Sequence, residues 1–279
     1  MPPAQPDPAD HYFSAAPTGA SARRSIELVL PEGRLIPLVT DAGVFSADKV
    51  DAGTRVLLTE GPAVPPTGVL ADVGCGYGAI AVALALRAPE GEVWAVDVNE
   101  RARALCRLNA DANGVGDRVR VVAPDEVPTD LVVDQLWSNP PIRIGKAPLH
   151  DLLRSWLVRL RPVSGSATLV VQKHLGADSL VRWLEAEGWP TQRLVSRAGY
   201  RILAVSPSTS TAATGAPTTG APKTGATPAS DAATSEIPSA EVPTADLTTD
   251  EVPTAEVPTD EVPTDEVPTG EVPTDEVPS

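Results

Sequence analysis

Short apolar runs alternate with longer amphipathic stretches over the first 205 residues of the chain. The runs predict buried strands at residues 68–73, 92–98, 119–122, 131–137 and 167–171. The stretches between and after them predict helices at 48–58, 79–86, 100–113, 149–160 and 179–187. This alternation indicates an α/β fold, a mostly parallel sheet with helices on both faces. Ligands bind such sheets at the carboxyl ends of the strands.

Two further strand pairs flank this alternation. Residues 25–30 and 34–39 surround Pro31-Glu32-Gly33 and predict an N-terminal β-hairpin. Residues 194–196 and 200–205 predict an antiparallel pair that closes the domain.

Charge divides the chain near Ser206. Residues 1–205 hold 21 basic and 23 acidic side chains, whereas residues 206–279 hold one lysine and 14 acidic side chains. A Ser/Thr/Ala/Gly/Pro segment is followed from Glu241 by pentads of the Glu-Val-Pro-Thr type, in which regular prolines exclude helix and strand. We therefore expect a disordered N-terminus at 1–10, a folded domain at 11–205 and a disordered acidic tail at 206–279. The tail is interpreted as solubilising, with mimicry of nucleic acid as the alternative.

Composition narrows the class of protein. Two cysteines, Cys75 and Cys106, do not form a disulfide framework, and no spaced Cys/His cluster predicts a metal. No signal peptide or membrane span is recognisable, so we expect a soluble, cytoplasmic protein that uses neither a metal nor a membrane. The nearly neutral domain shows no large basic field for nucleic acid.

A glycine-rich turn predicts the cofactor site. Asp72-Val-Gly-Cys-Gly-Tyr-Gly78 follows a strand and precedes a helix. Its glycines let the backbone approach a ligand, and the helix presents free N–H groups to a carboxylate. The Gly-x-Gly-x-Gly spacing differs from the dinucleotide pattern and argues against NAD. The residues expected to bind the cofactor here are Asp72, Gly74, Cys75, Gly76 and Gly78.

Acidic residues after the next two strands are further candidates. Asp97, with Val98 beside it, is expected to bind the ribose hydroxyls of a nucleoside cofactor, and the alternative is a helix cap. Asn99 fits the cap better. Asp125 is a candidate acceptor for the adenine amine, with Glu126 as its competitor and a plain loop acid as the alternative.

The segment Asn139-Pro140-Pro141-Ile142 ends an apolar run and predicts the catalytic pocket. The Asn139 side-chain oxygen and the Pro140 carbonyl can both accept hydrogen bonds from a planar –NH2 group. Such a pair would orient the amine nitrogen toward a methyl donor, a catalytic effect of position and electrostatics. Asn139 is also expected to contact the cofactor. The alternative is an ordinary strand-ending turn.

Together, these motifs resemble the small-domain class I methyltransferases, over about residues 11–205. The resemblance rests on residues 72–78, Asp97-Val-Asn-Glu-Arg-Ala102 and Ser138-Asn-Pro-Pro-Ile-Arg-Ile-Gly-Lys146, and includes 11–17 and 43–54. It implies a seven-stranded, Rossmann-like sheet and S-adenosylmethionine as methyl donor. It also implies the guanine N2 amine of small-subunit ribosomal RNA as acceptor, and hence ribosomal RNA or the small subunit as partner.

Several residues carry secondary expectations. Ile142 stands where many amino-methylating relatives have an aromatic residue. Arg143 and Lys146 are expected to bind phosphates beside a flipped nucleotide, with solvated charge as the alternative. The two phenylalanines, Phe13 and Phe45, either cover the cofactor or fill the core, and the core is favoured. Finally, Asp51, Gly53 and Thr54 are candidates to line the methionine end of the cofactor.

Three functions remain open at this point. The first is an RNA guanine-N2 methyltransferase. The second keeps the chemistry but uses another planar amine: a protein glutamine, a DNA adenine or a small molecule. The third is a binding module without catalysis, against which the intact glycine turn, Asp97 and Asn139 argue.

Overall fold

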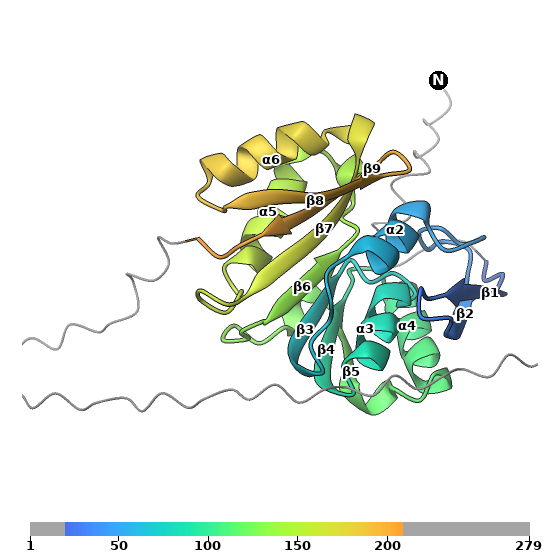
Figure 1. Cartoon of the computed structure of the whole chain (residues 1–279). Coiled ribbons are helices and arrows are strands. Elements are labelled where there is room, and N and C mark those ends of the chain that lie inside the picture. Colours follow the sequence, from blue (N-terminus) through green and yellow to red (C-terminus); the bar gives the residue numbers. More distant parts are fainter. Residues whose placement is uncertain (1–19, 209–279) are drawn as a thin grey trace, which may run out of the picture. The chain divides into compact units, whose positions relative to one another are not determined.

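The computed structural model describes residues 20–208, in which seven strands form one sheet (Figure 1). Their order across the sheet is β5-β4-β3-β6-β7-β9-β8. Five neighbouring strands are parallel, and β9 runs antiparallel to both β7 and β8. The predicted seven-stranded α/β sheet is therefore confirmed. The strands are β3 (Thr67–Val73), β4 (Glu90–Val96), β5 (Val119–Val122), β6 (Gln135–Ser138), β7 (Ser166–Gln172), β8 (Thr191–Arg197) and β9 (Tyr200–Val205).

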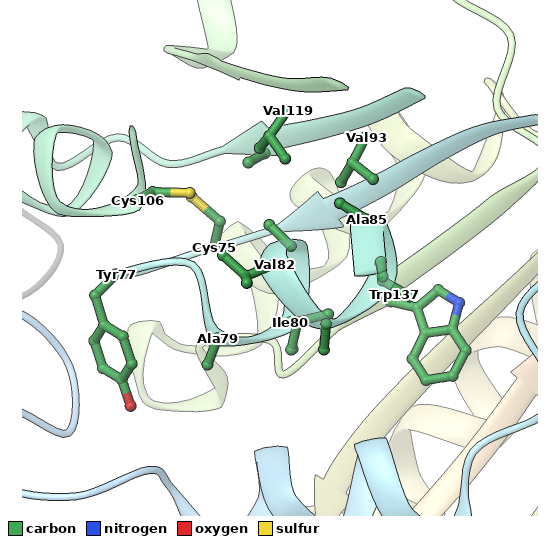
Figure 2. Packing of buried hydrophobic residues seen from close by; sticks show 14 of the residues in the cluster. Cys75, Tyr77, Ala79, Ile80, Val82, Ala85, Val93, Cys106, Val119 and Trp137 are labelled. Carbon is green, nitrogen blue, oxygen red and sulfur yellow. The ribbon is translucent and has the colours of Figure 1, made fainter. Parts of the chain in front are cut away.

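Helices cover the two faces of the sheet with separate hydrophobic clusters. One cluster joins α2, α3 and α4 to the sheet, and part of it is drawn in Figure 2 around Ile80, Val82 and Trp137. The other cluster joins α5 and α6 to the opposite face. The helices are α2 (Ala52–Glu60), α3 (Ala79–Arg87), α4 (Glu100–Ala112), α5 (Lys146–Leu157) and α6 (Ala177–Ala186), with short 3-10 turns η1 (Gly116–Arg118), η2 (Pro124–Glu126), η3 (Ile142–Ile144) and η4 (Lys173–Leu175).

The predicted N-terminal hairpin is confirmed as β1 (Arg24–Val29) paired with β2 (Leu35–Thr40). A fully buried asparagine of α4, Asn109, holds it in place. The Asn109 carboxamide bonds both backbone groups of Val39, and its Nδ2 also donates to the Tyr77 carbonyl at 2.7 Å. The hairpin is thus joined through α4 to the glycine turn.

The strand order creates a switch point beside β3. The chain passes from β3 outward to β4 and β5, and then returns to β6 on the other side of β3. The carboxyl ends of β4, β3 and β6 consequently meet at one edge, where the loops diverge and leave room for a ligand.

The structure corrects several element boundaries. Helix α5 spans Lys146–Leu157 rather than residues 149–160, and strand β8 spans Thr191–Arg197 rather than residues 194–196. The apolar run 131–137 is not one strand, because Val133 leaves the sheet and exchanges backbone hydrogen bonds with Arg159 and Arg161, so β6 begins only at Gln135. Helix α2 begins at Ala52 rather than residue 48, because Asp51 caps it. Strand β4 ends at Val96, which places Asp97 and Val98 in the loop.

Some predictions lie outside the described residues. They are the disordered N-terminus at 1–10, the motif at 11–17 with Phe13, and the acidic tail beyond Ser208. Within residues 20–208, no helix has the length and apolar character needed to cross a bilayer.

Candidate active site

A cavity of about 710 Å³ opens at the carboxyl edge of the sheet. Its volume lies in the range of ligand-binding sites. Its wall combines the glycine turn after β3, the loop after β4, the turn after β6 and the loop before α2. Sequence-predicted residues on the wall are Asp51, Thr54, Gly74, Cys75, Gly76, Asp97, Val98, Asn139, Pro140, Pro141, Ile142 and Arg143.

The glycine turn presents bare backbone to this cavity. Gly74 and Gly76 have φ angles of +76° and +55°, which L side chains rarely adopt. Apart from the glycine itself and its two chain neighbours, no atom of the described residues lies within 4 Å of a Cβ built at either position. Both glycines therefore leave open space that a ligand can occupy. The turn is fixed from behind, because the Gly74 and Cys75 amides donate to the Val96 carbonyl at 2.8 and 3.1 Å.

The side chain of Cys75 lies in the hydrophobic core beside Cys106. Figure 2 places Cys75 and Cys106 among the buried core residues, and both are free thiols. Contact with Cys106 and burial raise the pKa of the Cys75 thiol well above its ordinary value. The thiol therefore stays protonated.

Gly78, also expected to bind the cofactor, does not line the cavity and packs against Cys106. Its φ is +91°, and a Cβ there would lie 2.6 Å from Cys106 Sγ. We expect Gly78→Ala to lower the free energy of unfolding by about 1–3 kcal/mol, since it adds this clash to the backbone strain. Gly33→Ala is the control, because Gly33 has φ +78° with nothing within 4 Å. Equal losses in urea denaturation of the two variants would show that the Cys106 contact is unimportant.

Asp72 was expected to accept from the cofactor's amino group either directly or through ordered water, and it does not line the cavity, which disfavours the direct contact. The residue is fully buried, and its Oδ2 accepts from the Ala81 amide in the first turn of α3 at 2.9 Å. Among the described residues, Oδ1 has no hydrogen-bond partner. Asp72 thus joins β3 to the helix that follows the glycine turn. Burial raises its pKa to about 8, and the nearby charge of Asp97 adds to this effect.

This pKa predicts a pH-dependent stability difference for Asp72→Asn. A folded-state pKa above the unfolded value of about 3.9 means that the folded protein binds the proton more tightly. The Asp72 contribution is then most favourable at low pH and is lost as the pH rises toward 8. The introduced amide can still accept from the Ala81 N–H and does not titrate. The melting temperature of the variant relative to the original should rise between pH 5 and pH 8; a constant difference would contradict the assignment.

Asp97 lies on the cavity wall directly beyond β4. Its Oδ2 accepts from the Gly76 amide at 2.9 Å and its Oδ1 from the Asn99 amide at 2.8 Å. Burial raises its pKa, although these backbone donors oppose the shift. Each oxygen keeps a lone pair for a further donor. The cap of α4 is Asn99, whose Oδ1 accepts from Ala102 N at 3.1 Å, so Asp97 is not the helix cap.

The adenine candidates differ in position. Asp125 is exposed and does not line the cavity, although its neighbour Pro124 does. The Glu126 carboxylate accepts from the Ala123 amide at 2.6 Å and closes the 3-10 turn η2. Glu126 therefore has a structural partner, whereas Asp125 remains a predicted contact at the rim.

Asn139 has a fixed orientation. Its Nδ2 donates to Asp51 Oδ2 at 2.8 Å and to Thr54 Oγ1 at 3.1 Å. An ionised carboxylate accepts hydrogen bonds only, so the nitrogen must face Asp51. The described residues supply no hydrogen bond to Asn139 Oδ1. This oxygen is therefore an available acceptor on the cavity wall.

The two prolines form a tight turn beside this oxygen. The Ile142 amide donates to the Pro140 carbonyl at 2.8 Å, and Pro141 has φ −75° and ψ 76°, the geometry of an inverse γ-turn. One lone pair of the Pro140 carbonyl is thus occupied and the other is available. The turn holds the Ile142 side chain on the cavity wall.

The two predicted phosphate-binding cations occupy different positions. Arg143 is exposed and lines the cavity, whereas Lys146 is exposed at the start of α5 and does not line it.

Sequence reasoning missed two tyrosines and misjudged one phenylalanine on the wall. Tyr77 and Tyr200 both line the cavity, and burial followed by the Asp51 charge raises their pKa values. Both phenols are therefore neutral at physiological pH. Phe45 also lines the cavity and is 49% exposed, so it does not fill the core as expected. Tyr200 begins β9, and because β9 runs antiparallel to β7, this first residue lies at the edge where the parallel strands end. The predicted antiparallel pair at the end of the domain is the sequence signal for this position.

The residues present fit a nucleoside cofactor better than a metal. Open space above two glycines accommodates a ligand backbone, and a carboxylate at the end of β4 accommodates hydroxyl groups. Within residues 20–208, no three His, Cys, Asp or Glu side chains are grouped to hold a metal ion.

Comparison with known proteins finds a matching family model and relatives of similar sequence. The family model described as "Methyltransferase small domain" matches residues 36–204. The chain is 32% identical over 197 residues to "Uncharacterized protein YbxB" of Bacillus subtilis, covering 70% of this chain and 96% of that protein. It is 33% identical over 184 residues to ribosomal RNA small subunit methyltransferase C of Hahella chejuensis, covering 64% of this chain and 52% of that protein.

Among solved structures, the chain resembles the 16S rRNA N2 G1207 methyltransferase (RsmC) of T. thermophilus, which was determined in complex with AdoMet and guanosine. The TM-score is 0.56 and the identity is 26%, covering 67% of this chain and 51% of that one. The chain thus spans about half the length of both named ribosomal RNA methyltransferases.

Proposed function

The chain belongs to the methyltransferase small-domain family of class I, S-adenosylmethionine-dependent methyltransferases, and we propose that it methylates the exocyclic N2 amine of a guanine in ribosomal RNA. The predicted family resemblance and cofactor are confirmed, whereas the acceptor is the proposal. The observation that supports it most is the Asn139 carboxamide, whose nitrogen is anchored and whose oxygen is an available acceptor on the cavity wall.

The chemistry follows from what an aromatic amine needs. Its lone pair is delocalised into the ring, so the amine is a weak nucleophile. Acceptors for both N–H groups hold the amine in place and favour its attacking geometry. Asn139 Oδ1 and the remaining lone pair of the Pro140 carbonyl can fill these two positions. S-adenosylmethionine, when bound, supplies an electrophilic methyl group.

No strong general base is required of this chain. The methylated ammonium product is acidic and loses its proton readily to water. The tyrosines on the wall, Tyr77 and Tyr200, have raised pKa values and are neutral, so they are poorly suited to take that proton. The residues at the site therefore act mainly by orienting the amine.

We assign the cofactor to the half of the cavity at the carboxyl ends of β3 and β4. The open space at Gly74 and Gly76 would hold its methionine part, and Asp97 with Val98 would hold its ribose. Asp125 would accept from the adenine amine at the rim. This arrangement leaves the half beside Asn139, Ile142 and Arg143 for the acceptor, with Arg143 and Lys146 as contacts for flanking phosphates.

The relatives favour guanine as the acceptor. Hahella chejuensis methyltransferase C is named for the small-subunit ribosomal RNA, and the T. thermophilus enzyme for N2 of a 16S guanine. Asn-Pro-Pro by itself recognises a planar amine rather than a particular ring. The base is therefore assigned by likeness to these relatives, and the chemistry by the clamp, the pair of acceptors formed by Asn139 Oδ1 and the Pro140 carbonyl.

The test uses the full chain and methyl-labelled S-adenosylmethionine. Unmodified 16S and 23S transcripts, small subunits from cells lacking the gene, DNA and total protein are offered separately. Labelled N2-methylguanosine after digestion of the 16S transcript or of small-subunit RNA is the expected result. Label confined to protein or to DNA, or found on another nucleoside, would refute the proposed acceptor. Labelled N2-methylguanosine in 23S RNA alone would keep the proposed acceptor and move the target to the large subunit.

A further inference from the structure

We propose that Asp51 is a positioning residue for methyl transfer, because it sets which end of the Asn139 carboxamide faces the acceptor. The inference rests on the proposed function of Asn139. It differs from the sequence-based expectation, in which Asp51 lined the methionine end of the cofactor.

The contacts define a small network at the start of α2. Asp51 caps this helix, and its Oδ2 accepts from the Thr54 amide at 3.1 Å as well as from Asn139 Nδ2 at 2.8 Å. Thr54 Oγ1 is the second acceptor for the same Nδ2, at 3.1 Å. Thr54 itself is buried. Two acceptors from one helix terminus therefore bind Nδ2.

The orientation matters because a carboxamide has two unlike ends. If the amide were reversed, Oδ1 would face the Asp51 carboxylate and Nδ2 would face the target amine. Both contacts would then be unfavourable. The Asn139 oxygen would face the Asp51 carboxylate oxygen, and the Asn139 –NH2 group would face the N–H groups of the target amine. The charge of Asp51 makes the reversed state costly, because hydrogen bonds to ionised groups are the stronger ones.

Contact between α2 and β9 also helps to position Asp51. Gly53 lies against the Tyr200 ring, since a Cβ at Gly53 would be 2.8 Å from Tyr200 Cε1. A larger residue at this position would have to displace the Tyr200 ring or the Asp51 carboxylate, so Gly53 lets the first turn of α2 lie against the start of β9. The Asn139 turn after β6 is thereby connected to the far side of the sheet through α2.

The first test replaces the Asp51 carboxylate, which accepts from Asn139 Nδ2, by a carboxamide of the same shape. Asp51→Asn keeps a good helix cap but allows the Asn139 amide to reverse. We expect kcat to fall by about 10-fold to 100-fold, as for a misoriented catalytic group, while the cofactor Kd changes by less than about 3-fold. Asp48→Asn is the control, because Asp48 is an exposed carboxylate of the same loop, paired with Arg24. Unchanged kcat in Asp51→Asn, or a loss only in cofactor affinity, would overturn the proposal.

The second test exchanges donor and acceptor. Asn139→Asp places two carboxylates in contact, so one of them should take up a proton and activity should become strongly pH-dependent. In the double variant Asp51→Asn/Asn139→Asp, the introduced amide can donate to the introduced carboxylate, whose second oxygen remains for the amine. At pH 8 we expect this double variant to exceed Asn139→Asp in kcat by about 10-fold. A double variant no better than Asn139→Asp would contradict the pairing.

A third readout does not depend on methyl transfer. Nitrogen-15 NMR of the free protein reports the Asn139 side-chain amide protons directly. We expect a downfield, slowly exchanging pair that shifts in Asp51→Asn and stays unchanged in Asp48→Asn. If the original chain methylates no RNA but this pattern is seen, the proposed function fails and the positioning role stands. If RNA is methylated and the pattern is absent, the positioning role fails alone.

Discussion

Replacing Asn139 by alanine is expected to lower kcat by about 100-fold or more, while S-adenosylmethionine binds with nearly unchanged affinity. The reason is that Asn139 Oδ1 is proposed to accept a hydrogen bond from the target amine, a contact that strengthens as the nitrogen becomes cationic. Single-turnover methylation gives the rate, and calorimetric titration gives the cofactor affinity.

The Asn139→Ala result needs a structural control, because this side chain also joins the Asn139 turn to α2. Thermal unfolding should show a small loss of stability without loss of the fold. Asn113→Ala removes an asparagine at the end of α4, where it bonds the Pro37 carbonyl of the hairpin, and should leave kcat unaltered. Unchanged turnover in folded Asn139→Ala would refute the clamp.

Replacing Asp97 by alanine is expected to raise the cofactor Kd by about 10-fold to 100-fold, which corresponds to the loss of hydrogen bonds to a charged group. The loss has a direct part, the ribose contact, and an indirect part, because the Gly76 and Asn99 amides lose their acceptor. Titration with S-adenosylhomocysteine measures the change. At saturating cofactor, kcat should fall much less than in Asn139→Ala.

Asp97→Asn separates charge from shape and adds a pH test. Burial raises the Asp97 pKa in the free protein, so the ionised acceptor is lost at higher pH than for an ordinary carboxyl. Cofactor affinity should therefore weaken as the pH falls through that raised pKa, and the affinity of the Asp97→Asn variant should not follow this trend. Full affinity in Asp97→Ala would reduce Asp97 to a residue that only holds the glycine turn.

The parts of the site that the sequence predicted are local in the chain. The strand, glycine turn and helix around residues 72–79 are consecutive, and their φ angles require glycine, so pattern alone indicates the geometry. Likewise, Asp97 and Asn99 lie two residues apart, and because both residue types cap helices well, it is the position of Asn99 directly before the helix that separates their roles.

The parts that the sequence did not predict depend on tertiary contacts. Asp51 and Asn139 lie 88 positions apart, and nothing in either segment alone predicts their hydrogen bond. Asp72 was expected at the cofactor because it lies at the end of its strand beside the glycine turn, but its carboxylate accepts from the Ala81 amide in the first turn of α3. Phe45 was expected in the core because of its residue type, yet its loop places it half exposed at the cavity.

The proposed mechanism depends on a rigid amide and carbonyl clamp that grips the acceptor amine next to the bound methyl donor. A crystal structure of the full chain with S-adenosylhomocysteine and guanosine would observe this clamp in place. We predict that Asn139 Oδ1 lies about 3 Å from the guanine N2 atom, with the cofactor sulfur facing that nitrogen. Guanosine bound elsewhere, or a sulfur that faces away from residues 139–142, would rule the clamp out.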